Sequence, residues 1–128
     1  MVLQARTLAA LRLVVACHLA GLALQPVLAG QYMSGNDVLS AHAMIGETIA
    51  WIAIVQMLLA AICWFKNALP LWAVGTFVLI FAMDGFQIHM GYAKSLTIHI
   101  PLGASLLAIS FAMALWIWRY RPFERAAG

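Results

Sequence analysis

Four apolar runs, each long enough to cross a lipid bilayer, take up most of this 128-residue chain. A helix needs about 20 residues to cross the hydrocarbon core of a membrane. Hydrophobic residues make up 66% of the chain and charged residues only 9%, a balance foreign to soluble domains. We therefore expect an all-α bundle of four transmembrane helices, forming a single integral membrane domain over residues 1–128. The expected helices lie at about 13–31, 38–65, 68–90 and 96–118.

The seven Lys and Arg residues are distributed unevenly around these runs. Only Lys94 falls beside the turns that join the first helix to the second and the third to the fourth. The other six flank the opposite ends of the helices: Arg6, Arg12, Lys66, Arg119, Arg121 and Arg125. Cytoplasmic flanks retain positive charge during insertion, so we expect a multi-pass protein of the bacterial inner membrane with both termini cytoplasmic. The net charge of +3 follows from this bias and gives no support to nucleic-acid binding.

The second and fourth apolar runs open with the same pattern, a His followed four residues later by a Gly. The two copies are His42-x-x-x-Gly46 and His99-x-x-x-Gly103. In the preceding helix of each copy a Gln and a Gly lie near the same end: Gln25 and Gly30, then Gln87 and Gly91. These patterns indicate a helical hairpin used twice, as parallel repeats about an axis along the membrane normal. Both His residues then lie at the same depth, roughly 5 Å inside the helix ends.

A pair of membrane-embedded imidazoles at matched depth favours a metal site. A His inside lipid has to pair or coordinate, and neutral imidazole is a standard axial ligand of haem iron. Small residues beside it would let a porphyrin approach, although Gly also mediates close helix contacts in membranes. We expect one haem b whose iron is held by His42 and His99. The cofactor-binding residues expected around it are Gly30, Gly46, Gly91, Gly103, Gln87 and His89.

Four further ionisable residues fall within the apolar runs, and the sequence is compatible with several roles for them. His89, close in depth to the predicted ligands, is their main rival and otherwise belongs at the porphyrin edge or at the water interface. His18 has no His partner at its own depth, so a second haem there is not expected, and we interpret it as a hydrogen-bonded interior residue. Glu47 and Asp84 could bond to His18, orient a ligand, carry protons, or form a polar cluster that holds helices together.

The motifs resemble those of a known family. The sequence Phe86-Gln87-x-x-x-Gly91 followed by His99-x-Pro-Leu-Gly103, with its counterpart around Gln25 and His42, is similar to one four-helix half of haem A synthase. The resemblance runs from about Gln25 to Trp118 and consists of short motifs. It implies a four-helix fold with haem-ligating histidines on the second and fourth helices. That family has an acidic residue before and an Arg directly after its second-helix His, whereas this chain reads Ser40-Ala41-His42-Ala43. The resemblance therefore implies a stand-alone haem b protein rather than the haem-modifying oxidation.

Two axial imidazoles leave no open coordination position, which favours electron transfer over catalysis. We expect a membrane b-type cytochrome, an electron carrier or a haem-bearing subunit of a larger respiratory or redox complex, with quinone as a further candidate partner and no catalytic residue assigned. Motifs of other metal sites, such as Glu-x-x-His pairs and His-Glu-x-x-His, do not occur in the sequence. The alternative is a cofactor-free structural or accessory subunit of a larger membrane complex.

Overall fold

The computed structural model describes residues 2–122 and contains four α-helices. They are α1 (Val2–Met33), α2 (Leu39–Phe65), α3 (Leu71–Tyr92) and α4 (Leu96–Arg119). Each is long and apolar enough to cross a membrane, and the part of the chain that is described contains no strand. The prediction of an all-α, four-helix membrane bundle is confirmed.

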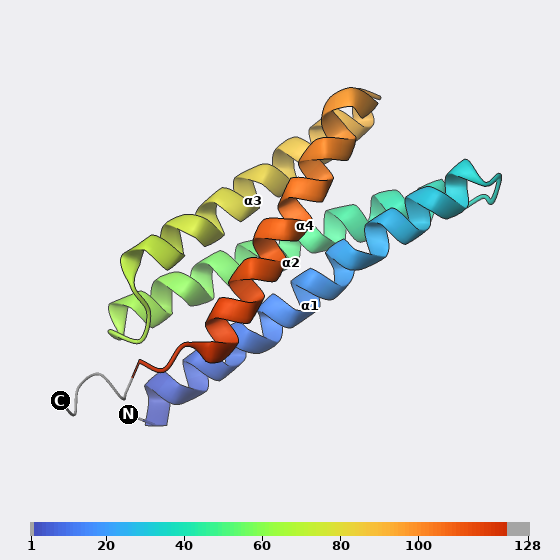
Figure 1. The fold of residues 1–128 in the computed structure, drawn as a ribbon. Helices are drawn as coiled ribbons and strands as arrows, with labels where there is room; N and C mark the ends of the chain where they lie inside the picture. The colour runs from blue at the N-terminus through green and yellow to red at the C-terminus, as the bar shows by residue number, and fades with distance from the viewer. Residues whose placement is uncertain (1, 123–128) are drawn as a thin grey trace.

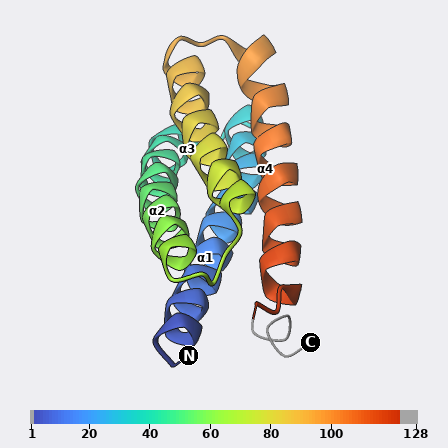
Figure 2. The same cartoon turned by 90° about the vertical axis from the view of Figure 1, so that its left-hand side faces the viewer.

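The helices run alternately up and down, so that all the connections lie at the two ends of the bundle. The start of α1, the α2–α3 turn and the end of α4 share one end, here called the terminal end, and the other two turns share the hairpin end (Figures 1 and 2). Each helix packs against the next, and α4 packs against α1. The pairs α1/α3 and α2/α4 therefore face each other diagonally. Towards the hairpin end the α1–α2 hairpin diverges from the α3–α4 hairpin (Figure 1).

Helix α1 is longer than predicted, because it begins at Val2 rather than near residue 13. The sequence interpretation counted only the apolar run and treated Arg6 and Arg12 as a flank. Arg12 instead belongs to the helix and donates hydrogen bonds to the carbonyls of Ile117 (3.0 Å) and Tyr120 (2.8 Å) at the end of α4. The added turns of α1 thus supply donors to carbonyls that a helix C-terminus leaves without partners.

The three turns share one stop signal, the Schellman motif, in which a residue of left-handed conformation follows the helix. After α2 this residue is Asn67 (φ 54°), and the amide of Ala68 donates to the carbonyl of Cys63 at 2.8 Å. Gly35 (φ 92°) ends α1 and Lys94 (φ 55°) ends α3 in the same way. Because the motif ends α2 at Phe65 and Pro70 lies at the N-cap of α3, α3 begins at Leu71, three residues later than predicted.

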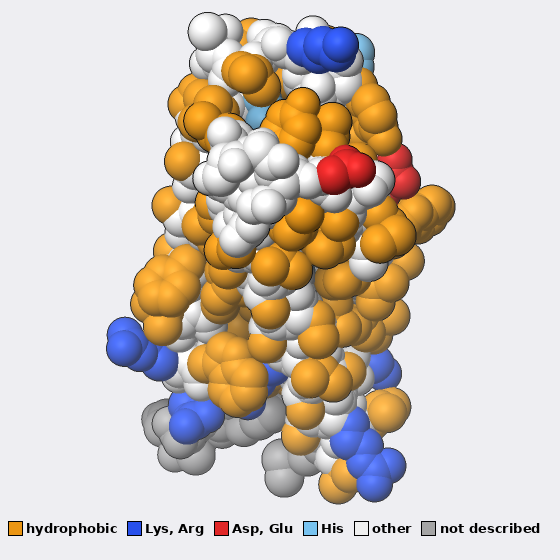
Figure 3. Space-filling model, turned by 90° about the vertical axis from the view of Figure 1, so that its right-hand side faces the viewer, with side chains coloured by type: hydrophobic (Ala, Val, Ile, Leu, Met, Phe, Trp, Pro, Cys, Tyr) orange, Lys and Arg blue, Asp and Glu red, His pale blue; other side chains and the backbone are white. Residues whose placement is uncertain are grey.

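The interior is narrow and mostly aliphatic, with Leu11, Phe77, Ile80, Leu106 and Ile117 among its fully buried side chains. Large apolar side chains also cover the outside, as expected of a surface that faces lipid, and Lys and Arg gather beyond this apolar band at the terminal end (Figure 3). Each helix contributes one buried polar residue: His18, Gln56, Asp84 and Ser110. Polar side chains are costly in so apolar an interior, so these four residues are candidates for a functional role.

Candidate functional site

His42 and His99 meet near the hairpin end of the bundle. His42 lies in the first turn of α2 and His99 in the first turn of α4, so the two side chains approach across the diagonal of the bundle. Their ring centres are 6.1 Å apart and their planes are inclined by 62°. Both residues are half-buried. The matched depth that the sequence predicted thus corresponds to a direct approach of the two imidazoles.

The orientation of the His99 ring is set by the backbone of α3. Nδ1 of His99 lies 2.9 Å from the carbonyl oxygen of Gln87. Because a carbonyl can only accept, Nδ1 carries the proton, and in the neutral ring the lone pair is on Nε2. A bond of this kind fixes both the tautomer and the ring direction of a metal-binding His.

Gly91 provides the space in which the His99 ring lies. A Cβ atom at Gly91 would be 3.0 Å from Cε1 and 3.2 Å from Nδ1 of His99, which is closer than ordinary van der Waals contact. Any larger residue at this position would push the imidazole away from the Gln87 carbonyl.

His42 is held differently. Its Nδ1 is buried and has no hydrogen-bond partner among the residues described. Its backbone carbonyl accepts a bond of 3.2 Å from the side-chain amide of Gln25 on α1. A buried ring nitrogen without a partner is uncommon in a folded protein. Nδ1 of His42 is such an atom.

The same Gln-to-Gly contact occurs in both hairpins. A Cβ atom at Gly46 would lie 3.6 Å from Nε2 of Gln25, and one at Gly103 would lie 2.7 Å from Nε2 of Gln87. In each hairpin a Gln of the first helix therefore packs over the Gly that follows the His by one turn. The predicted repeat is seen here as a repeated local packing arrangement. Oε1 of Gln87 is buried and has no hydrogen-bond partner within the described range.

Two of the expected cofactor-binding residues lie apart from this cluster. The His89 side chain is exposed. Gly30 is exposed too, and a Cβ atom there would meet nothing within 4 Å. The structure thus brings together the two His residues with Gln87, Gly46, Gly91 and Gly103, and leaves His89 and Gly30 outside.

His18 and Asp84 form a second polar contact, deeper in the bundle. Nε2 of His18 lies 2.9 Å from Oδ2 of Asp84, and the two side chains are 1% and 4% exposed. The prediction of a hydrogen-bonded interior His18 is confirmed, with Asp84 as its partner. The contact joins α1 to α3 across one diagonal, whereas the His42–His99 approach joins α2 to α4 across the other. Glu47 is exposed and instead accepts a bond of 2.5 Å from the hydroxyl of Tyr92.

The separation of the two rings is compatible with one metal ion held by both imidazoles. Rings on opposite sides of one metal ion, each with a metal–nitrogen bond of about 2 Å, have centres about 6 Å apart, and the observed separation is 6.1 Å. The two ring planes are inclined by 62°, so the rings meet edge to face rather than stacked. Over the described range 2–122, no group of three or more His, Cys, Asp and Glu side chains gathers as a metal site.

Sequence reasoning missed the backbone of Gln87 as the acceptor for His99. It also gave no role to the buried side chains of Gln56 and Ser110. Gln25 and Gln87 were recognisable from their repeat. The contact of the Gln87 carbonyl with His99 was not, because it depends on how closely α3 and α4 approach. Comparisons of this chain with family models, with curated proteins and with solved structures found no match.

Proposed function

We propose that this multi-pass membrane protein is a b-type cytochrome that binds one haem b through His42 and His99. The observation that carries the proposal is the approach of these two imidazoles across the bundle, with ring centres 6.1 Å apart. The pair would correspond to the histidines of the second and fourth helices in one half of haem A synthase.

The surroundings of the pair support a bound macrocycle rather than a simple stacking contact. The bond from His99 to the Gln87 carbonyl leaves Nε2 free to ligate. The His42 ring has no such bond, although its Nδ1 is buried. A haem propionate or a water molecule held beside the macrocycle would give that nitrogen the partner that residues 2–122 do not supply.

His42 and His99 would hold the haem, and the haem would supply one-electron redox chemistry there. The Gln87 carbonyl would hold the His99 ring in place for ligation. We therefore propose electron transfer, either as a carrier or as a subunit of a larger respiratory or redox complex, with quinone as a candidate partner. The distribution of Lys and Arg supports a location in a bacterial inner membrane with both termini in the cytoplasm.

The visible spectrum of the purified protein tests the proposal. We expect a low-spin spectrum typical of two imidazole ligands, with about one haem per chain. His42→Gly and His99→Gly should each lose this spectrum, and free imidazole should restore part of it. Recovery by imidazole would separate the loss of a ligand from a loss of folding.

His89→Gly is the matched control, because His89 is exposed and near the same end of the bundle. Its spectrum should be that of the unaltered protein. If a helical, well-folded preparation stays colourless even after haem is supplied, the proposal is wrong and a cofactor-free accessory subunit is favoured. If His89→Gly loses haem while His99→Gly keeps it, the ligand assignment is wrong.

A further inference from the structure

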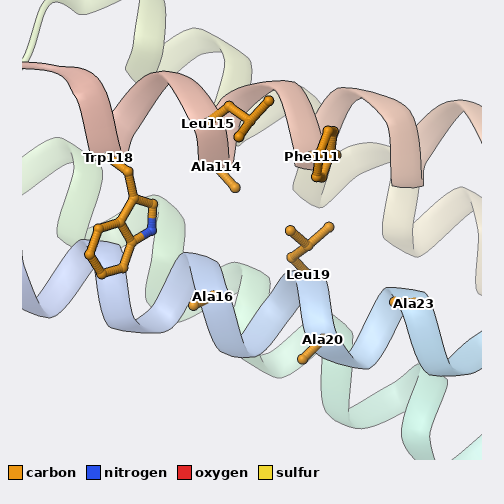
Figure 4. Close-up of a pocket in the computed structure, with 8 residues that line it drawn as sticks. All are labelled: Ala16, Leu19, Ala20, Ala23, Phe111, Ala114, Leu115 and Trp118. Atoms are coloured by element: carbon orange, nitrogen blue, oxygen red, sulfur yellow. The ribbon is translucent and has the colours of Figure 1, made fainter.

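A long apolar groove runs between α1 and α4, apart from the His pair. It consists of two adjoining hollows of about 360 and 510 Å³, which share Leu19, Ala23 and Phe111. Small side chains form much of the lining, including Ala16 and Ala20 on α1 (Figure 4). Every residue that lines either hollow is apolar. In a membrane such a groove takes a hydrocarbon chain without leaving a polar group unsatisfied.

The groove has a positively charged mouth at the terminal end. Trp118 lines the last part of the groove, and the guanidinium of Arg12 lies 5.9 Å from the centre of its ring. Arg12 is one helical turn before Ala16, which lines the same hollow. Arg119 follows Trp118 in the chain and Arg121 follows Tyr120, and both arginines are exposed. The groove therefore ends beside the guanidinium of Arg12, and two more arginines follow within the next residues of the chain.

Among residues 2–122, no acidic side chain lies near this mouth. The acidic side chains that the structure describes are Asp37, Glu47 and Asp84, and all three belong to the half of the bundle nearer the hairpin end. Arg12 uses Nε and one Nη to bond the carbonyls of Ile117 and Tyr120, and its other Nη bonds to no residue of the described range. Basic pockets between transmembrane helices are places where anionic lipid headgroups bind.

We propose that the α1–α4 groove is a binding site for an anionic phospholipid, with one acyl chain in the groove and the phosphate on Arg12 and its neighbouring arginines. The length agrees with this occupant. From Arg12 to Ala23 the groove rises about 16 Å along α1, and one leaflet contributes about half of a 30 Å hydrocarbon core.

Charge favours this occupant over two others. A second copy of the chain with the same orientation in the membrane would bring its own Arg12, Arg119 and Arg121 beside these, and like charges repel. A neutral prenyl chain would fill the groove and leave the arginines unpaired. An anionic phospholipid meets both requirements, an apolar chain and a negative headgroup.

The test uses native mass spectrometry of the full chain in detergent, with phosphatidylglycerol or phosphatidylcholine of identical acyl chains added. We expect retention of phosphatidylglycerol to exceed that of phosphatidylcholine by about fivefold for each arginine engaged. Arg12→Gln should reduce this preference by about fivefold, and Arg12→Lys should keep most of it. Ala108→Phe, which fills the groove without changing any charge, should abolish retention of both lipids.

Ala82→Phe is the control for added bulk, because Ala82 is an exposed residue of α3 outside the groove. It should retain phosphatidylglycerol as the unaltered chain does. Equal retention of the two lipids, or unchanged retention in Ala108→Phe, would overturn the proposal. So would a prenyl quinone extracted from the unaltered chain but not from Ala108→Phe, or a dimer that Ala108→Phe dissociates.

Discussion

Because Gly91 has no side chain, the His99 imidazole can lie against it. Its ring occupies the space that a Cβ atom would need, and there its Nδ1 reaches the Gln87 carbonyl. The position of a predicted metal ligand thus depends on a residue of the neighbouring helix, eight positions earlier in the chain.

Gly91→Ala should weaken haem binding. The new methyl group would displace the His99 ring from its preferred rotamer, at a cost of about 0.5–1.5 kcal/mol, and we expect the haem affinity to fall by about two- to tenfold. Haem titration of the apoprotein, followed by absorbance, measures this change. Gly30→Ala is the control, since a Cβ atom there meets nothing within 4 Å. An equal fall in both variants would contradict the role given to Gly91.

The buried contact between His18 and Asp84 should contribute to stability without holding haem. His18→Leu or Asp84→Leu leaves one polar group buried without its partner, which costs about 1–3 kcal/mol. In the double variant both groups are removed, so its loss of unfolding free energy should be smaller than the sum of the two single losses. Unfolding in detergent by added dodecyl sulfate measures these values.

Ser110→Ala is the control for that comparison, because its hydroxyl is buried and unpartnered among the described residues. Its unfolding free energy should change little. The haem spectrum of His18→Leu should match that of the unaltered protein. Additive losses in the double variant would show that the pair contributes nothing as a pair.

Among the elements, α1 differs most from its neighbours, because it reaches past the apolar core and supports the ends of two other helices. Gln4 donates to the carbonyl of Lys66 after α2 at 2.6 Å, and Arg12 donates to two carbonyls at the end of α4. The first turns of α1 therefore act as a side-chain cap for helices that are far from it in the sequence.

Gln4→Ala should loosen the α2–α3 turn. The lost hydrogen bond is worth about 0.5–1.5 kcal/mol, and amide hydrogen exchange at Asn67 and Ala68 should become faster. Hydrogen-exchange mass spectrometry of the detergent-solubilised chain measures these exchange rates. Thr7→Ala is the control, since the Thr7 hydroxyl bonds only to Leu3 of its own helix. Unchanged exchange at the turn in Gln4→Ala would mean that the cap has no effect there.

The number of helices and the ends of most of them could be predicted from the sequence, because apolar length sets them. The start of α1 could not, since Arg12 resembles a membrane flank until its partners at the end of α4 are known. The meeting of His42 and His99 was predictable from their matched depth. Their placement across the bundle was predictable too, because parallel repeats about an axis put the two copies on opposite sides of it. The carbonyl that orients His99 was not, because it depends on how closely α3 and α4 pack, which no local pattern encodes.

At the scale of the whole molecule, the two ends differ in their content of Lys and Arg. Five described Lys and Arg residues belong to the terminal end, and Lys94 belongs to the hairpin end: the five are Arg6, Arg12, Lys66, Arg119 and Arg121. Figure 3 shows Lys and Arg side chains gathered at the terminal end. This asymmetry predicts an orientation in the membrane with the terminal end in the cytoplasm.

Reporter fusions test this orientation. A fluorescent protein that folds only in the cytoplasm should be bright when fused after Gly128. Alkaline phosphatase, which is active only outside, should be active when inserted at Asn36 and inactive at the C-terminus. The reverse pattern would refute the orientation and move the His pair to the cytoplasmic side.

Both diagonal contacts join residues from different hairpins, since His18 pairs with Asp84 and His42 approaches His99. Neither hairpin can complete either contact within itself. If the two hairpins descend from one ancestral unit, that ancestor had to associate with another molecule to bring two such imidazoles together, and joining the copies in one chain made this association permanent.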